Sequence, residues 1–284
     1  MNINPREHIA LITGANAGIG LELTRKLLSE GWQVVALNRS GFPEDDMSIR
    51  NAVRDGSLRI YKTEDLADYA SLKQSLKEIK SKERRIDILF NNAGGSFPGL
   101  SYSKQGREKH YELLTVVPYI ILMELKELLN SGRLKTVINT SSSAQKFTKE
   151  FSIDILERPK TFRKLIGPYA TSKLALSLWT HAIAPQLAND GIQIRSVDPG
   201  GNNTLRKGKT SGLPFPVGIL MKLFFSPPTH GADKLHEGAL GKYRNKTGVF
   251  LMKGQVVDLK FMDQARNVLD RIQAIYEHEF LRSE

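Results

Sequence analysis

Short apolar runs and longer amphipathic segments alternate along the chain. The apolar runs end at turn residues and predict buried strands at residues 8–13, 32–38, 58–63, 86–90, 136–139, 193–197 and 249–251. Between them, apolar residues recur at helical spacing and predict helices at 18–30, 69–82, 108–130, 169–187 and 231–240, with a further helical segment after Asp263. Strands that alternate with helices predict an α/β fold with a doubly wound parallel sheet and helices on both faces.

The pattern contains no internal repeat and no linker, so we expect one domain over residues 1–284. Residues 201–230 are rich in Gly, Pro and Lys and predict a substrate lid, which would exclude water from a reaction. The lid also carries apolar residues suited to a lipophilic ligand: Leu213, Phe215, Val217, Ile219, Leu220, Met221, Leu223 and Phe224. Packing on the core or on a second subunit explains the same residues equally well.

The composition excludes several kinds of chemistry. The chain has no cysteine, which rules out disulfides, cysteine-bound zinc, iron–sulfur clusters and thiol nucleophiles. Its six histidines show no metal-ligand spacing, so we expect no metal site. We see no signal peptide and no apolar stretch long enough to span a bilayer, and therefore expect a cytoplasmic protein without a transmembrane segment.

The formal net charge of +11 permits binding to nucleic acid, an anionic membrane surface or a phosphorylated ligand. The densest basic clusters, residues 80–85 and 206–209, lack the interleaved aromatic side chains on which single-stranded nucleic acid stacks. We therefore interpret the charge as a solvated basic surface and expect no nucleic-acid partner.

A glycine-rich turn, Thr13–Gly20, joins the first predicted strand to the first helix. Gly14 permits a tight turn, and Gly18 and Gly20 allow a ligand or another backbone to approach closely. The helix that follows points its free amides at this turn, where a pyrophosphate would bind. The segment predicts a dinucleotide site that includes Asn16 and Ile19; a simple packing turn is the alternative.

The end of the second strand bears on the choice of cofactor. NAD-binding proteins usually place an acidic residue there, which accepts hydrogen bonds from the ribose hydroxyls. This chain instead has Asn38, followed by Arg39 and Ser40. A guanidinium pairs well with a 2′-phosphate, so the sequence favours NADP(H) over NAD(H). An exposed arginine without a ligand is the alternative.

Tyr169 and Lys173 are four residues apart on a predicted helix and therefore lie on one face. A phenol with a pKa of ~10 is a poor acid–base catalyst at neutral pH, but a nearby ammonium favours the phenolate and lowers that pKa. Three serines, Ser141, Ser142 and Ser143, follow the fifth strand. The pair and the serines predict a proton-transfer site. The alternative is a partly buried tyrosine beside a solvated lysine without a catalytic role.

Together these motifs resemble the short-chain dehydrogenase/reductase family. The T-G-x-x-x-G-x-G turn, Asn91-Asn-Ala-Gly94 after the fourth strand and the Y-x-x-x-K pair carry the resemblance, which extends from Ile9 to about Asp258. Residues 226–233 and the long gap between Ser142 and Tyr169 look most like the retinol-dehydrogenase-like and carbonyl-reductase members. The resemblance implies a Rossmann-type fold and a homodimer or homotetramer.

The resemblance also implies residue roles. Ser142 would polarise a carbonyl oxygen, Tyr169 would protonate it, and Lys173 would tune Tyr169 and hold the nicotinamide ribose. Further cofactor contacts would come from Asp65, Leu66, Asn91, Ala93, Gly94, Pro199, Gly200, Asn202 and Thr204. One position departs from the family. Thr115 stands where an asparagine usually anchors a water molecule of the proton relay. Three consequences are open: Thr115 substitutes for the asparagine, the relay is rebuilt, or catalysis is impaired.

The leading prediction is an NADP(H)-dependent oxidoreductase that interconverts a carbonyl and a primary or secondary alcohol on a lipophilic small molecule. Two alternatives remain open at this point. The first is a dinucleotide-binding sensor or scaffold of the same fold with weak catalysis, which Thr115 supports. The second is a protein that binds nucleic acid or a membrane surface through its basic charge.

Overall fold

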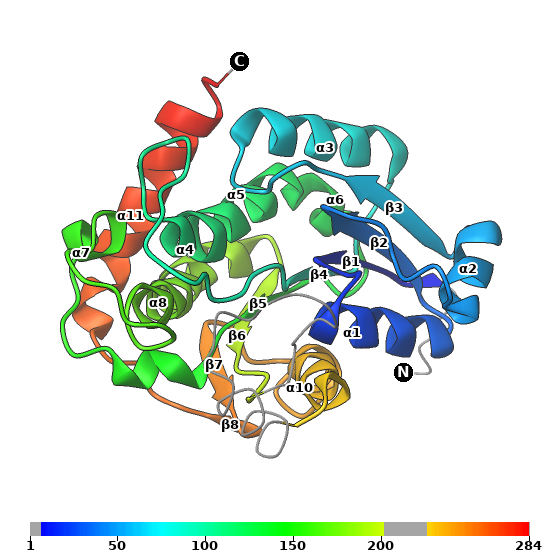
Figure 1. Ribbon diagram of the computed structural model, residues 1–284. Helices are drawn as coiled ribbons and strands as arrows, with labels where there is room; N and C mark the ends of the chain where they lie inside the picture. The colour runs from blue at the N-terminus through cyan, green and yellow to red at the C-terminus, as the bar shows by residue number, and fades with distance from the viewer. Residues whose placement is uncertain (1–6, 202–225, 284) are drawn as a thin grey trace, which may run out of the picture.

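A single eight-stranded sheet forms the centre of the computed structural model, which describes residues 7–201 and 226–283 (Figure 1). The strand order is β3-β2-β1-β4-β5-β6-β7-β8, and every neighbouring pair is parallel except β7 and β8. The strands are β1 (Ile9–Thr13), β2 (Gln33–Asn38), β3 (Leu58–Lys62), β4 (Ile88–Asn91), β5 (Thr136–Thr140), β6 (Gln193–Val197), β7 (Val249–Met252) and β8 (Gln255–Val256). The predicted α/β fold with a doubly wound parallel sheet is confirmed.

Helices cover both faces of the sheet (Figure 1). One face packs against α1 (Gly18–Ser29), α2 (Met47–Arg54) and α10 (Pro228–Leu240). The other packs against α3 (Tyr69–Lys82), α5 (Val117–Glu124), α8 (Pro168–Asn189) and α11 (Ala265–Ile275). Shorter helical elements are α4 (Lys109–Tyr111), η2 (Glu112–Val116), α6 (Lys126–Asn130), η3 (Ser143–Phe147), α7 (Ile153–Glu157), η4 (Met262–Gln264) and η5 (Tyr276–Phe280).

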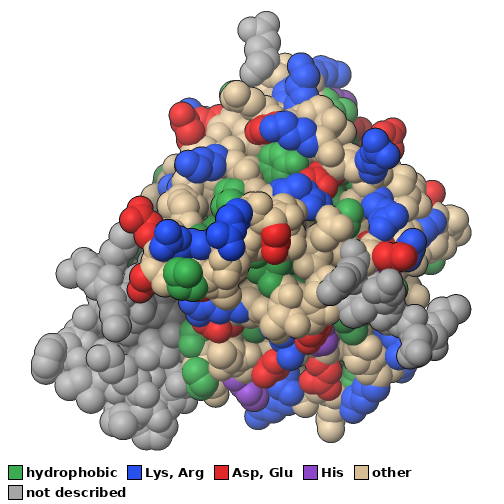
Figure 2. Space-filling view, turned by 90° about the vertical axis from the view of Figure 1, so that its right-hand side faces the viewer, with side chains coloured by type: hydrophobic (Ala, Val, Ile, Leu, Met, Phe, Trp, Pro, Cys, Tyr) green, Lys and Arg blue, Asp and Glu red, His purple; other side chains and the backbone are tan. Residues whose placement is uncertain are grey.

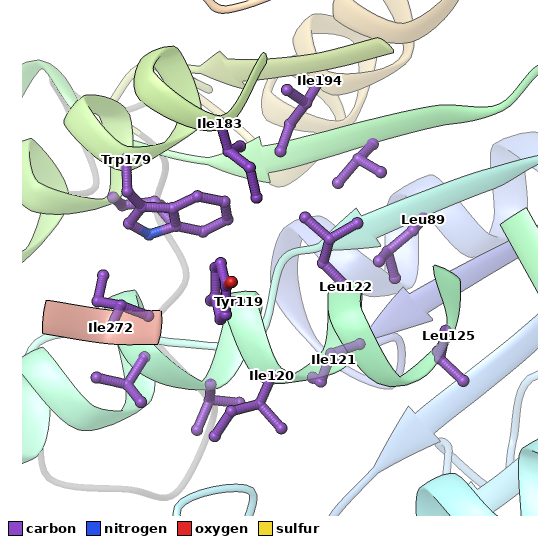
Figure 3. Close-up of a cluster of buried hydrophobic side chains, with 14 of the residues drawn as sticks. Leu89, Tyr119, Ile120, Ile121, Leu122, Leu125, Trp179, Ile183, Ile194 and Ile272 are labelled. Atoms are coloured by element: carbon purple, nitrogen blue, oxygen red, sulfur yellow. The ribbon is translucent and has the colours of Figure 1, made fainter. Parts of the chain in front are cut away.

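The larger of the two cores lies between the sheet and the layer of α3, α5, α8 and α11. Figure 3 shows its centre, where side chains of α5 meet those of α8, α11 and the neighbouring strands. Tyr119 and Trp179 pack edge to face there, with their ring centroids 5.6 Å apart. Every residue of β1 is buried, and so is every residue of β2 except Gln33. Helices cover both faces of the sheet, which explains why the sequences of these strands are almost continuously apolar.

The helix predicted over residues 108–130 is wrong as one continuous element. The structure divides it into α4, the π-helical segment η2, α5 and α6, with α5 ending before Leu125. Pro118 lies in the first turn of α5 and has no N–H, so the carbonyl of Leu114 loses its normal α-helical partner. This loss accounts for the wider turn of η2, an arrangement that often marks functional regions.

The surface that faces the viewer in Figure 2 mixes lysine and arginine side chains with aspartate and glutamate and shows no single basic stripe. Within residues 7–201 and 226–283, no helix has both the length and the apolar character needed to cross a membrane. Most of the predicted lid, residues 202–225, lies outside the described residues, and so do all its apolar lining residues. The lid therefore stays a prediction.

Candidate active site

The predicted site residues follow the carboxyl ends of the central strands. From β1 the sheet continues to β2 and β3 in one direction and to β4, β5 and β6 in the other. The strand order thus reverses between β1 and β4, and ligands of open α/β sheets bind beyond the carboxyl ends at such a point. The glycine turn after β1, the serines after β5 and Asp198 after β6 all lie at this edge.

The glycine-rich turn is held in a fixed shape by its neighbours. Gly14 has φ of +66°, and its N–H donates to the carbonyl of Leu37. The side-chain oxygen of Asn38 accepts a hydrogen bond of 2.7 Å from the N–H of Ala15. A Cβ atom at Gly20 would lie 2.1 Å from the carbonyl oxygen of Gly14, so this position requires glycine. Asn38 therefore supports the turn, a role that its sequence position alone does not reveal.

The residues around the turn fit a dinucleotide. Helix α1 begins at Gly18 with no side-chain cap and no acidic residue in its first turn, so its amides are available to an anion. The side-chain nitrogen of Asn38 is buried and has no hydrogen-bond partner among the described residues. A free donor beside a free helix N-terminus suits an anionic or hydroxyl-rich ligand. Ile19, in the first turn, packs against the apolar core.

Arg39 and Ser40 continue the turn region on its outer side. Arg39 is exposed and has no hydrogen bond or ion pair within the described parts of the chain. The side-chain nitrogen of Asn16 donates to both oxygens of Ser40 and to the carbonyl of Gly41. These bonds fix the segment after β2 against the glycine turn and bring Arg39 to the edge of the site.

Two further loops follow strands at the same edge of the sheet. After β4, the amides of Asn92 and Ala93 donate to the Thr13 hydroxyl, and Gly94 leaves no room for a side chain because its Cβ would meet Leu114. After β3, the Asp65 carboxylate accepts from the N–H of Ala67, while Leu66 is buried in the core.

Asn91 has a structural role at the sheet centre. Its side-chain nitrogen donates to the Asn139 side-chain oxygen at 2.9 Å and also to the carbonyl of Pro118. Asn139 lies beside it on β5 and donates in turn to Thr180 on α8. These bonds link β4, β5 and α8 at the centre of the sheet, so the side-chain nitrogen of Asn91 is engaged within the protein.

Ser142, Tyr169 and Lys173 come together at the ends of β5 and α8. The Ser142 side chain lies near the Tyr169 phenol, close enough to lower its pKa, and the Ser142 hydroxyl accepts a hydrogen bond from the N–H of Ala144. Lys173 is 5% exposed, and its Nζ donates to the carbonyl of Thr140. Ser141 instead hydrogen bonds to Ser177, a structural contact.

Asp198 joins the serine loop to the loop after β6. Its carboxylate accepts hydrogen bonds from the N–H of Ser143 at 3.0 Å and of Gly200 at 3.2 Å. Gly200 and Pro199 are therefore held beside the serines, whereas Asn202 and Thr204 lie outside the described residues.

The pKa of Tyr169 differs from the expectation of a lowered value. Burial raises it, the nearby Ser142 hydroxyl opposes the rise, and the negative charge of Asp198 adds to it. The ammonium of Lys173 is bound to Thr140 rather than to the phenol, which explains why its lowering effect is missing. Burial also lowers the pKa of Lys173 itself, to about 7.

Thr115 occupies η2 and faces α8. Its hydroxyl donates to the carbonyl of Ser172 at 2.8 Å, and its own carbonyl accepts from the indole nitrogen of Trp179 at 3.2 Å. The side chain does not bond one turn back on its own helix but bridges two helices. Both oxygens of Thr115 are therefore engaged within the protein.

Sequence reasoning missed His110 and Glu108. His110 is fully buried and packs against the ring of Tyr169, with centroids 6.0 Å apart. Its Nδ1 contacts the fully buried carboxylate of Glu108 at 2.7 Å. The pair lies at the start of a predicted helix, where a histidine reads as an ordinary helix residue, so no sequence signal marked it.

A family model described as short chain dehydrogenase matches residues 8–153 of this sequence. The chain belongs to the short chain dehydrogenase family. It is thus a member of a family of oxidoreductases. The predicted resemblance is confirmed.

Two curated relatives illustrate its place in the short chain dehydrogenase family. Retinol dehydrogenase 12 of Mus musculus is 29% identical over 201 residues, which cover 70% of this chain and 63% of that protein. Polyprenol dehydrogenase of Homo sapiens is 29% identical over 206 residues, which cover 70% of this chain and 62% of that protein. The match thus spans less than two thirds of the length of each of these relatives.

Solved structures share the fold of this short chain dehydrogenase. An NADPH-bound carbonyl reductase from chicken fatty liver has a TM-score of 0.64 at 22% identity, covering 88% of this chain and 98% of its own. A 4-hydroxyisoleucine dehydrogenase complexed with NADH has a TM-score of 0.65 at 20% identity, covering 86% and 96%. One neighbour thus carries NADPH and the other NADH, so the fold alone leaves the cofactor open.

Proposed function

We propose that this chain is an NADP(H)-dependent oxidoreductase that interconverts a carbonyl and a primary or secondary alcohol, with Tyr169 as general acid and base. The observation that carries the proposal is the meeting of Ser142, Tyr169 and Lys173 at the edge of the sheet where the glycine turn also lies. A bound nicotinamide would supply or accept the hydride. Side chains of the protein would bind the substrate oxygen and transfer the proton.

Ser142 and Tyr169 would act on the substrate oxygen. The Ser142 side chain lies near the Tyr169 phenol, so a substrate oxygen bound beside both hydroxyls would receive two donors. Because burial and Asp198 raise the pKa of Tyr169, the phenol keeps its proton at neutral pH and is suited to protonate the oxygen in the direction of reduction. In the direction of oxidation, Tyr169 would need a positive charge nearby to become a base.

Lys173 would supply that charge when a ligand changes its surroundings. Its Nζ, now on the Thr140 carbonyl, is one helical turn from Tyr169 and would hold the nicotinamide ribose. With a pKa of about 7, Lys173 can gain or lose a proton in the physiological range. It is therefore suited to pass a proton as well as to bind.

The preference for NADP(H) rests on Arg39. The guanidinium is exposed at the end of β2 and has no partner within the described residues, and Asn38 replaces the acid that would repel a 2′-phosphate. The segment that carries Arg39 is fixed by the bonds of Asn16 to Ser40 and Gly41. A phosphate beside Arg39 would receive charge-assisted hydrogen bonds.

A panel of lipophilic aldehydes and ketones with NADPH tests the proposal. We expect loss of NADPH absorbance at 340 nm with at least one carbonyl, and no loss with the Tyr169→Phe variant. Tight NADPH binding without turnover of any carbonyl or alcohol would instead favour a dinucleotide sensor. Thr115, whose two oxygens are both engaged within the protein, is the observation that favours this second candidate.

The proposal has four further features. The apolar residues of the predicted lid favour a lipophilic substrate, and the sequence pattern favours one domain. The family resemblance favours a homodimer or homotetramer, which we place in the cytoplasm. Size-exclusion chromatography with light scattering tests the assembly directly.

A further inference from the structure

Three aromatic side chains, one of them that of the proposed proton donor, gather around one imidazole. The ring centroid of His110 lies 4.7 Å from that of Phe97, 6.3 Å from that of Phe162 and 6.0 Å from that of Tyr169. Phe97 belongs to the loop after β4, Phe162 to the segment before α8, and Tyr169 to α8 itself. Three separate parts of the chain thus contribute rings to one cluster.

The imidazole at the centre is fixed in one orientation. The N–H of Phe97 donates to Nε2 of His110 at 2.9 Å, so Nε2 carries no hydrogen. Nδ1 therefore carries the hydrogen and donates it to the Glu108 carboxylate at 2.7 Å. Glu108 also accepts from the N–H of Tyr111, which anchors the pair to α4. His110 is consequently a neutral ring that cannot turn without breaking two hydrogen bonds.

The four rings differ in exposure. His110 is fully buried, whereas the residues Phe97, Phe162 and Tyr169 are partly buried. The imidazole is thus the most deeply buried ring of the cluster. The ammonium of Lys109 lies 5.3 Å from the Phe97 centroid and borders the cluster at that ring.

We propose that Phe97, His110 and Phe162 form, with Tyr169, an aromatic subsite for a flat π-conjugated group bonded directly to the reacting carbonyl. The ligand class is an aryl or α,β-unsaturated aldehyde or ketone, or the corresponding allylic or benzylic alcohol. This inference rests on the proposed function, because it places the carbonyl oxygen at the hydroxyls of Tyr169 and Ser142.

The physical basis is the geometry of ring contacts. Aromatic rings attract one another in offset-stacked or edge-to-face arrangements, beyond the gain from buried apolar area. A saturated ring of the same size is puckered and has no π face, so it makes only the area-dependent contact. The difference corresponds to about a tenfold preference for the unsaturated ligand.

Matched substrates measure this preference. Benzaldehyde is compared with cyclohexanecarbaldehyde, and acetophenone with cyclohexyl methyl ketone, as kcat/KM ratios with NADPH. Phe97→Leu and Phe162→Leu remove these two rings but keep apolar bulk. Phe151→Leu is the control, because Phe151, between η3 and α7, is also partly buried but stacks on Phe261 instead. Dividing each variant's ratio by that of the unchanged protein cancels the intrinsic reactivity of the carbonyls.

We expect the aromatic-to-saturated ratio to fall about tenfold in Phe97→Leu or Phe162→Leu and to stay constant in Phe151→Leu. A ratio that stays constant in both cluster variants, or falls equally in the control, would overturn the subsite.

A binding measurement separates the subsite from the proposed reaction. Benzamide and cyclohexanecarboxamide are unreactive mimics of the two carbonyl classes, and their binding to the NADP⁺-loaded protein can be followed by ligand-observed NMR. If no carbonyl is turned over but benzamide binds more tightly and loses this advantage in Phe97→Leu and Phe162→Leu, the subsite stands and the reaction fails. If neither the rates nor binding distinguish the two classes, the subsite is overturned.

Discussion

The Nζ of Lys173 donates a hydrogen bond of 2.5 Å to the carbonyl oxygen of Thr140, the last residue of β5. This bond places a lysine nitrogen at the end of a central strand, almost completely removed from solvent. No acidic residue contributes to its environment strongly enough to offset burial, which lowers the pKa of Lys173 to about 7. The folded protein therefore carries a cost for protonating this lysine that the unfolded chain does not have.

That cost predicts how stability depends on pH. Lys173 has a pKa of about 7 in the folded protein and an ordinary value of 10.5 in the unfolded chain. Between these values the unfolded chain binds one more proton, so this group makes the free energy of unfolding rise with pH. Relative to a Lys173→Met variant, the cofactor-free protein should gain about 1.4 kcal/mol per pH unit between about pH 7 and pH 10.

Urea unfolding of both proteins at pH 7, 8 and 9 measures this difference. Below pH 7 the difference between the two should level off, because the lysine is then protonated in both states. A difference that does not change with pH would show that Lys173 keeps its ordinary pKa in the folded protein.

Tyr169→Phe tests the proton donor. The change removes one hydroxyl and leaves the ring that packs on His110, so the fold and NADPH binding should be preserved. We expect kcat to fall by about 10²- to 10⁴-fold, the usual contribution of general acid–base catalysis. Stopped-flow absorbance and NADPH fluorescence titration measure the two quantities. Undiminished turnover would exclude Tyr169 as the acid.

Arg39→Ala tests the cofactor preference. Loss of the guanidinium should weaken NADPH binding by about 10-fold or more and leave NADH binding almost unchanged, because only NADPH carries the 2′-phosphate. Arg50→Ala is the control, since Arg50 is also exposed but lies on α2. Equal weakening of both cofactors, or an equal effect of the control, would contradict an Arg39–phosphate contact.

Gly20→Ala tests the close packing of the glycine turn. Its Cβ would lie 2.1 Å from the carbonyl oxygen of Gly14, whereas a Cβ at Gly41 would meet nothing within 4 Å. We expect Gly20→Ala to lower the free energy of unfolding by roughly 1–3 kcal/mol, as overpacking does, and Gly41→Ala to have almost no effect. Thermal unfolding followed by circular dichroism compares the two variants, and similar melting temperatures would refute the predicted clash.

Local patterns were sufficient to predict the sheet and the motifs at its edge. The predicted bounds of α3 and β6 agree with the structure. The amphipathic spacing of α3 is a local signal that a sequence carries by itself. Tyr169 and Lys173 are one helical turn apart in the sequence itself, and Ser142 follows a strand that the sequence predicts. Such spacings depend on a few neighbouring residues and can be predicted from the sequence without knowledge of tertiary contacts.

Contacts between distant segments could not be predicted from the sequence. Asn38 supports Ala15 across two strands, and His110 reaches Tyr169 from another helix. The short helix α2 was missed because it has only two buried residues, and the π-helical turn of η2 depends on Pro118 and on contacts with α8. In each case tertiary packing, which a single sequence does not record, decides the local structure.

The ring of Phe280 in η5 is fully buried and packs edge to face on Tyr69 of α3. Nearby, Arg107 binds the carboxylate of Glu279, 172 residues further along the chain, as well as Glu112 and the Tyr69 hydroxyl. During synthesis, Tyr69 and Arg107 therefore leave the ribosome long before the residues that cover them. Until residue 280 is available, α3 and the segment around Arg107 must remain partly uncovered, and this interval is when the growing chain would most need a chaperone.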